Sequence, residues 1–339
     1  MNKLKQNLCA ENSAMAIFFL FALLLPIFMS EYKVTAFSNF YIAAILALSL
    51  SLVWGYTGIF SFGAVAFYGV SAYIYAILSL ASGNMALTPL FMVIAVLIST
   101  LFAAVIGYFM FYGGINDVFV GLITLCVTLV LETFMAQTAG SKWQLLGVAL
   151  GGYNGINKVP TLHLGSFALK GHSFYFFTLL LLAAVYIWMR YISKRKLGYT
   201  LIAIRENRLR SQLFGYNVPF IQTAVFAASG AIAALAGVLY TAWGGYITPS
   251  AMALTPATIP VVVVAAGGRK NITAAMIFAV LYAWFSQMLS ASGSRYALII
   301  LGLVLIAAIL FVPNGFIASI FDWLDQGLFS KFKGKEAVE

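Results

Sequence analysis

The sequence predicts an all-α bundle of membrane-spanning helices, and three observations carry this prediction. Of the 339 residues, 63% are hydrophobic and only 8% are charged, where soluble domains have about 25% charged residues. The mean hydropathy is +0.99, and a soluble fold of this size could not keep so much apolar surface from water. The apolar stretches approach the roughly 20 residues of a spanning helix, rather than the ~10 residues of a membrane-barrel strand. This composition excludes a soluble enzyme, a secreted disulfide scaffold and a disordered protein.

Ten apolar segments are candidates for spans. They cover residues 14–29, 40–54, 61–80, 89–111, 118–137, 174–191, 221–243, 257–266, 272–289 and 297–312. The segment 257–266 is too short to cross about 30 Å of hydrocarbon at ~1.5 Å per residue. Because Pro256 and Pro260 fall in or beside it, we expect a broken or re-entrant element there. No cleavage site follows the first segment, so we expect it to remain as the first span.

The positive charges predict the orientation of the chain. If the N-terminus lies inside and the spans alternate, 14 of the 19 Lys and Arg residues fall inside and five fall outside, as the positive-inside rule requires. We therefore predict a multi-pass protein of the bacterial inner membrane with both termini in the cytoplasm. Residues 1–339 form one membrane domain in this prediction, with a periplasmic loop at 138–173 and a basic cytoplasmic loop at 193–218.

Five spans in each half would give two halves of opposite orientation, as in inverted-repeat transporters. One weak similarity between the halves supports such a repeat: Trp54-Gly55 follows the second predicted span, and Trp243-Gly244 follows the seventh. Aromatic-glycine pairs are common in membrane proteins, so this similarity leaves the repeat open.

The sequence carries little that could do chemistry. It has no Gly-x4-Gly-Lys-Ser/Thr phosphate loop, and its two cysteines and two histidines have no metal-ligand spacing. We expect no cofactor, no metal and no enzymatic activity. Glu132 is the one acid clearly inside a predicted span. It could be a proton relay or a substrate contact, or a structural group that is buried and bonded to a neighbouring helix or close enough to the outer interface to reach it. A proton-driven pump usually needs more than one such group, which favours a subunit driven by another component.

The loop 193–218 combines charge with a regular apolar spacing. Leu201, Ile204, Leu209 and Leu213 recur near helical intervals, and Gly215 is a plausible helix stop. This pattern predicts one short amphipathic helix of two to four turns. Such a helix could rest on anionic lipid or dock into a partner protein.

The same loop resembles the cytoplasmic loop of the branched-chain amino acid (Liv-like) ABC transporter permeases, a run Gly-x-Ala-Leu-x-Ala-Ile-Arg-Glu-Asn that ends in Leu-Gly-x-Asn. Residues 55–73 resemble the signature Gly-Tyr-x-Gly-x-x-Ser-x-Gly of that family. Weaker resemblances follow in the same order as in the family: the Gly-Gly loop at 150–156, the Gly-Gly turn at 264–269 and the closing Pro-x-Gly at 311–316. The length and the outer loop resemble the longer of that family's two permease subunits.

Three places depart from the family pattern, and one of them is Leu150, which stands where the family has Thr. Ala64 stands where the family usually has a polar residue, and Arg269-Lys270-Asn271 follows the Gly-Gly turn. A Gly-Gly-Arg run also occurs in relatives assigned to urea or short amides, so the resemblance leaves the substrate open.

The resemblance implies a permease subunit of an ATP-driven importer for branched-chain or related amino acids, which forms half of the translocation pathway and has no ATPase site of its own. The implied partners are a second permease subunit, two cytoplasmic ATP-binding subunits, a periplasmic substrate-binding protein and the lipid bilayer, with no nucleic acid. The alternatives are an ABC permease for urea or short amides, a self-powered secondary transporter or channel, and a membrane scaffold. A scaffold explains the hydrophobicity but not the amphipathic loop.

Two groups of residues follow as candidate sites. Glycines at the signature let helices break or approach closely, so that backbone amides meet the substrate in the membrane. We expect the pathway to be lined by Thr57, Gly58, Ser61, Gly63, Thr124 and Glu132. We expect coupling to the ATPase through Gly198, Leu201, Ile204, Arg205, Glu206, Asn207, Leu209 and Gly215.

Overall fold

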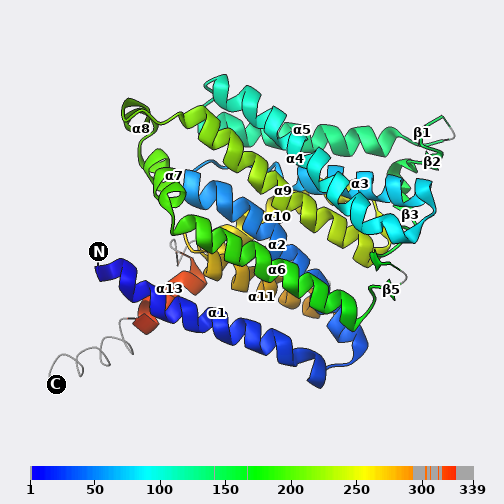
Figure 1. Ribbon diagram of the computed structural model, residues 1–339, viewed down its shortest axis with the longest axis horizontal. Helices are drawn as coiled ribbons and strands as arrows, with labels where there is room; N and C mark the ends of the chain where they lie inside the picture. The colour runs from blue at the N-terminus through cyan, green and yellow to red at the C-terminus, as the bar shows by residue number, and fades with distance from the viewer. Residues whose placement is uncertain are drawn as a thin grey trace.

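The computed structural model describes residues 2–140, 142–165, 167–292, 302–303, 306, 312 and 315–325. Long helices lie side by side with their axes roughly aligned (Figure 1). Within the described part of the chain, eight of them are long and apolar enough to cross a membrane. They are α1 (Asn2–Phe28), α2 (Glu31–Leu50) with its π-helical continuation η1 (Ser51–Thr57), α3 (Ala64–Ser82), α4 (Thr88–Tyr112), α5 (Asp117–Gln137), α6 (His172–Ser193), α9 (Val218–Gly244) and α11 (Ile272–Ala291). The prediction of an all-α membrane bundle is confirmed.

Many of the shorter elements lie at the two ends of the bundle (Figure 1). The helices α7 (Lys196–Glu206) and α8 (Arg208–Leu213) lie at one end, which we call the α7–α8 end. The strands lie at the opposite end, which we call the strand end. The remaining described helices are η2 (Met85–Leu87), η3 (Gly152–Asn154), η4 (Pro249–Met252), α10 (Leu254–Gly267) and α13 (Phe316–Leu324).

Most predicted spans coincide with a described helix, but their boundaries differ. The first helix starts at Asn2 rather than at residue 14, so it includes Glu11. The helix α10 has only 14 residues, with Pro260 inside it. The predicted tenth span at 297–312 lies almost wholly outside the described residues. The count of ten spans and the inverted repeat therefore stay predictions.

The helix α9 lies at the centre of the bundle, where it packs against α2, α3 and α4. Glycines allow this close packing, because a side chain at their positions would collide with a neighbour. A Cβ atom at Gly237 would lie 2.0 Å from the carbonyl oxygen of Tyr68, and one at Gly230 would lie 2.4 Å from the Cβ of Ala103. Asn217 caps the start of the helix, because its Oδ1 accepts a hydrogen bond from Phe220 N at 3.1 Å. Pro219 lies in the first turn, where a missing backbone N–H has no cost.

Most of the strands are contributed by the segment 138–173. Two antiparallel hairpins form there, β1 (Gln144–Leu145) with β2 (Val148–Ala149) and β4 (His163–Leu164) with β5 (Phe167–Ala168). Between them, β3 (Ile156–Asn157) pairs antiparallel with β6 (Tyr246–Ile247), which directly follows α9, in the register Ile156 to Ile247. Gly155 makes this pairing possible, since a Cβ there would lie 2.0 Å from the carbonyl oxygen of Ile247. The segment is therefore attached to the end of the central helix.

Candidate functional site

The first signature forms a break between two helices. The chain leaves α2 through the π-helix η1, turns at Gly58 with φ of +77°, and resumes as α3 at Ala64. A positive φ of this size is typical of the residue that follows a helix, and it favours glycine. Thr57 donates a hydrogen bond from Oγ1 to the carbonyl of Val53 at 2.6 Å, so its hydroxyl is used within the helix that ends here. Short π-helical turns recur at functional sites.

The broken segment is fastened to α5. The backbone N–H of Phe62 donates to Thr124 Oγ1 at 3.1 Å, and Thr128 Oγ1 donates to the carbonyl of Phe62 at 3.4 Å. Ser61 Oγ accepts a hydrogen bond from Gly63 N at 3.0 Å. The structure therefore brings together three predicted pathway residues, Ser61, Gly63 and Thr124. Thr128 was missed by sequence reasoning, although its four-residue spacing from Thr124 places it on the same face of a helix.

Glu132 does not belong to this cluster. It lies eight residues beyond Thr124 on α5, which corresponds to about 12 Å along the helix axis at ~1.5 Å per residue. Its carboxylate is half-buried and accepts a hydrogen bond from Thr133 Oγ1 at 3.3 Å. The predicted pathway residues are thus placed at two levels of the bundle.

Arg205 links α7 to the broken segment. Its Nη1 donates to the carbonyl oxygen of Gly55 at 2.6 Å, and its side chain is 19% exposed. Gly58 leaves room for this side chain, because a Cβ there would lie 2.8 Å from Arg205 Cγ. The same guanidinium pairs with Glu206 at 3.0 Å, an exposed contact of small energetic value.

The Gly-Gly turn meets the broken segment at the same place. A Cβ at Gly55 would lie 2.1 Å from the carbonyl oxygen of Arg269, and the Arg269 guanidinium lies 5.7 Å from the centre of the Trp54 ring. At the other side of the turn, a Cβ at Gly315 would lie 2.2 Å from Gly268 Cα. The signature, the α7 helix, the Gly-Gly turn and the closing glycine therefore converge on one junction, although they are far apart in the sequence.

The loop 193–218 does not form the single amphipathic helix that the spacing predicts. The chain is extended at Asn207 (φ −159°, ψ 105°), which separates α7 from α8 and caps α8 by accepting a hydrogen bond from Arg210 N at 2.8 Å. Leu201 and Ile204 are each 1% exposed and pack inside the chain, whereas Leu209 is 67% exposed. The expected common stripe is therefore wrong, because the break at Asn207 separates its residues.

Another set of apolar side chains on this loop faces outward. It consists of Leu197, Tyr199, Leu209, Leu213 and Phe214, whose exposed fractions range from 57% to 81%. We call this set the α7–α8 apolar face. Gly198 and Gly215, the two glycines predicted to take part in coupling, lie where a side chain would be strained. A Cβ at Gly198 would lie 2.2 Å from the carbonyl oxygen of Ser193, and Gly215 has a φ of +86°.

The helix α8 is joined to α5 by an ion pair. Arg208 Nη2 contacts Asp117 Oδ1 at the first residue of α5. Gln222 of α9, with its amide oxygen turned toward Arg208, accepts hydrogen bonds from Nε and Nη2 at 2.9 Å each. α5 therefore contacts the broken segment along its length and α8 at its start.

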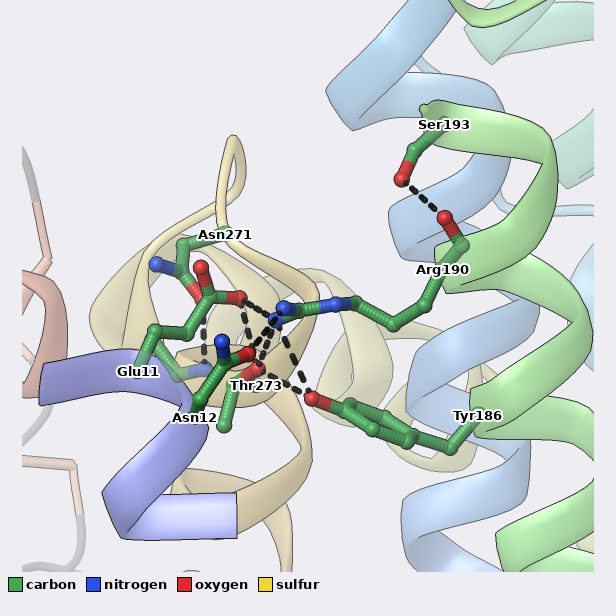
Figure 2. A network of polar contacts seen from close by, with 8 residues as sticks. Glu11, Asn12, Tyr186, Arg190, Ser193, Asn271 and Thr273 are labelled. Atoms are coloured by element: carbon green, nitrogen blue, oxygen red, sulfur yellow. Dashed lines mark hydrogen bonds and ion pairs between the residues drawn. The ribbon is translucent and has the colours of Figure 1, made fainter. Parts of the chain in front are cut away.

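A buried polar network links α1, α6 and α11 (Figure 2). Arg190 pairs with Glu11 and donates from Nη2 to Asn12 Oδ1 at 2.6 Å, while Thr273 Oγ1 donates to Glu11 Oε1 at 2.7 Å. Tyr186 and Thr273 share a hydrogen bond of 2.6 Å. Sequence reasoning missed this network because it started the first span after Glu11. The signal was available, since an acid and a base within apolar helices predict a partner for each other.

Comparison with known proteins agrees with the resemblance found in the sequence. Residues 33–309 match the family described as branched-chain amino acid transport system / permease component. The chain is 23% identical, over 80% of its length and 66% of the relative's, to the high-affinity branched-chain amino acid transport system permease protein LivM of Escherichia coli. It is also 23% identical to the protein of the same name from Salmonella typhimurium, over 88% of its own length and 74% of the relative's. The probable branched-chain amino acid transport permease protein LivM of Methanocaldococcus jannaschii is 30% identical over 36% of each chain.

No solved structure matches the chain. The family match nevertheless covers most of the sequence, including the broken segment, the α7 and α8 helices and the Gly-Gly turn. The chain belongs to the family of branched-chain amino acid transport system permease components.

Proposed function

We propose that the chain is a permease subunit of an ATP-driven ABC importer, and that it forms half of the pathway by which branched-chain or related amino acids cross the inner membrane. The family and the names of the relatives support the transport class and the substrate class. The observation that carries the mechanism is the contact of Arg205 with Gly55. It joins the helices exposed at one end of the bundle to the helix break inside it.

The broken segment is reached from the α7–α8 end by two routes. The first runs through Arg205 to Gly55, directly before the break. The second runs through Arg208 to Asp117, then along α5 to Thr124 and the backbone of Phe62. A partner ATPase that binds the α7–α8 apolar face and moves it would displace both sides of the break together, as in rigid-body switching of packed helices. This arrangement supports the prediction that the loop 193–218 couples the permease to ATP hydrolysis.

The position of Glu132 supports a place for α5 beside the pathway. A charged side chain in the middle of a membrane helix costs about 2.5–3.5 kcal/mol when it faces lipid. Glu132 is half-buried and lies four residues after Thr128, on the face of α5 that bonds to the broken segment. We place this face of α5 against the second permease subunit or the aqueous path rather than against lipid.

Transport by the reconstituted system tests the proposal. The chain is co-expressed with candidate second permease and ATP-binding subunits from the same genome, and proteoliposomes are supplied with the candidate binding protein. We expect uptake of radiolabelled leucine that needs ATP and is unaffected by collapse of the proton gradient. Uptake by the chain alone under an ion gradient would contradict the proposal, and ATP-dependent uptake of urea in place of leucine would establish the alternative substrate.

A further inference from the structure

A partly open cavity of about 240 Å³ lies between α2, α3, α9, α10 and α11. Its wall includes Val65 and Tyr68, which lie in the first turns of α3 directly after the break. The space exists because small residues face it where larger ones would fill it. These are Ala43, Ala47, Ala251 and Ala279.

The size and lining of this cavity suit a small aliphatic group. At about 240 Å³, the cavity is many times larger than the space that admits one water. It therefore has room for a small organic molecule. Ile259, Val263 and Leu46 complete a wall that is mostly apolar, and apolar cavities favour apolar occupants over water.

Tyr68 contributes a hydroxyl group to this wall. The residue is only 7% exposed and lines the cavity, and none of the side-chain hydrogen bonds among the described residues uses its hydroxyl. A buried hydroxyl without a partner is costly, so most are paired. Other buried tyrosines follow this rule: Tyr41 shares a hydrogen bond of 2.7 Å with Tyr175, and Tyr75 donates to the carbonyl of Pro160 at 3.0 Å.

The proline inside the helix α10 leaves a backbone acceptor beside the cavity. Pro260 has no backbone N–H, so it cannot donate to the carbonyl of Pro256 as a regular helix residue would. Both prolines line the cavity. Half-helices with free backbone groups are the usual way in which membrane transporters hold polar parts of a substrate.

Aromatic side chains connect the cavity with the strand end. The ring of Tyr68 lies 5.7 Å from that of Tyr240, whose hydroxyl shares a hydrogen bond of 3.1 Å with that of Tyr246. Tyr246 is 38% exposed on the strand β6. The cavity is therefore bordered by a row of rings with hydroxyls that ends at the surface.

We propose that this cavity is a substrate subsite inside the permease, for a small zwitterion with a short branched aliphatic side chain. The alanines and Ile259 take the aliphatic group, Tyr68 Oη donates to the carboxylate, and the free carbonyl of α10 accepts from the ammonium. The subsite rests on the proposed function and deepens it, because it places selection by side-chain size within the membrane as well as in the binding protein.

The first test uses two tyrosines on one helix. Tyr68 and Tyr73 both lie on α3 and both are buried, but only Tyr68 lines the cavity. In proteoliposomes with the whole complex and saturating binding protein, we expect Tyr68→Phe to slow leucine uptake about fivefold, the effect of one lost hydrogen bond. Tyr73→Phe is expected to stay within about twofold of the unsubstituted complex. Equal rates for both variants would overturn the subsite.

The second test fills the cavity and compares two substrates. Ala43→Leu places a larger side chain in it, whereas Ala36→Leu changes a half-buried alanine of the same helix α2 that does not line it. We expect Ala43→Leu to slow leucine uptake about tenfold and to leave alanine uptake within about twofold, with Ala36→Leu slowing neither. An equal loss of leucine and alanine uptake would show a structural or lipid-filled cavity and overturn the subsite.

The two proposals fail in different ways. If the unsubstituted complex takes up leucine with ATP while every cavity variant transports normally, the subsite is wrong and the proposed function stands. If the unsubstituted complex takes up neither leucine nor alanine, the proposed function fails and the subsite fails with it. Co-purification of the ATP-binding subunits with each variant confirms that a slower rate does not arise from lost assembly.

Discussion

Gly55 is the residue on which the junction depends most directly. Its Cα faces the carbonyl of Arg269 so closely that a Cβ would lie 2.1 Å from that oxygen. Its own carbonyl accepts the hydrogen bond from Arg205. One backbone unit thus contacts two other segments of the chain, and neither contact leaves room for a side chain.

Gly55→Ala is therefore expected to destabilise the chain by at least about 1–3 kcal/mol, the usual cost of overpacking, because the obstacle is backbone. Gly244→Ala is the matched control, since its Cβ would meet only the ring of Tyr246 at 3.1 Å, which can move. The measurement is thermal unfolding of the purified chain in detergent. Equal melting temperatures for the two variants would contradict this prediction, because they would show that the junction accommodates a side chain at Gly55 without loss of stability.

The ion pair of Glu11 and Arg190 makes a second prediction at the scale of the residue. The side chains are only 14% and 11% exposed, and the removal of one partner from a buried pair costs about 3–5 kcal/mol. We expect Glu11→Gln to lower the unfolding temperature in detergent clearly. Glu206→Gln removes the same charge from a pair whose acid is 68% exposed, and it is expected to change stability by less than about 1 kcal/mol. Equal changes in unfolding temperature for the two variants would contradict the prediction, because they would show that Glu11 is solvated.

At the scale of the element, α7 and α8 differ in which way their leucines face. Leu201 of α7 is buried in its own chain, and Leu209 of α8 is exposed on the α7–α8 apolar face. Sequence reasoning assigned the same docking role to both, because periodicity alone gives no information about a helix break such as the one at Asn207. The two positions therefore separate folding from docking.

We expect Leu201→Asp to leave little chain that elutes as a single peak in size-exclusion chromatography, since an unpaired charge is buried. Leu209→Asp is expected to fold normally and to retain about a tenth or less of the ATP-binding subunit in co-purification. If Leu209→Asp binds the ATP-binding subunit as strongly as the unsubstituted chain, the α7–α8 apolar face contacts lipid or another partner instead.

At the scale of the whole molecule, orientation is the property that charge predicts and the fold alone does not. The short helices α7 and α8 and the strands lie at opposite ends of the bundle, so the two loops lie on opposite sides of any membrane that the bundle crosses. We expect a reporter fused after Val218 to report the cytoplasm, and one fused near Gly155 to report the periplasm. Two reporters that give the same side would contradict the bundle as well as the charge count.

Much of this architecture was accessible from the sequence, and the rest was not for identifiable reasons. Apolar runs predict where helices lie, and glycine at 58 and 63 predicts the break, because both depend on neighbouring residues. The contact of Gly55 with Arg269 and the pairing of β3 with β6 join residues far apart in the chain, and no local pattern encodes them. The cavity beside Tyr68 likewise depends on five helices at once.

The pairing of β3 with β6 has a consequence for communication across the bundle. It attaches the segment 138–173 to the end of α9, and α9 runs without interruption from Gly244 back to Gln222 in its first turns, about 33 Å at ~1.5 Å per residue. Gln222 faces Arg208, which holds α8. If the proposed function holds, a binding protein that displaces the strands at one end acts on a continuous helix whose other end contacts α8. We therefore expect the loaded binding protein outside to stimulate ATP hydrolysis inside before the substrate enters the membrane.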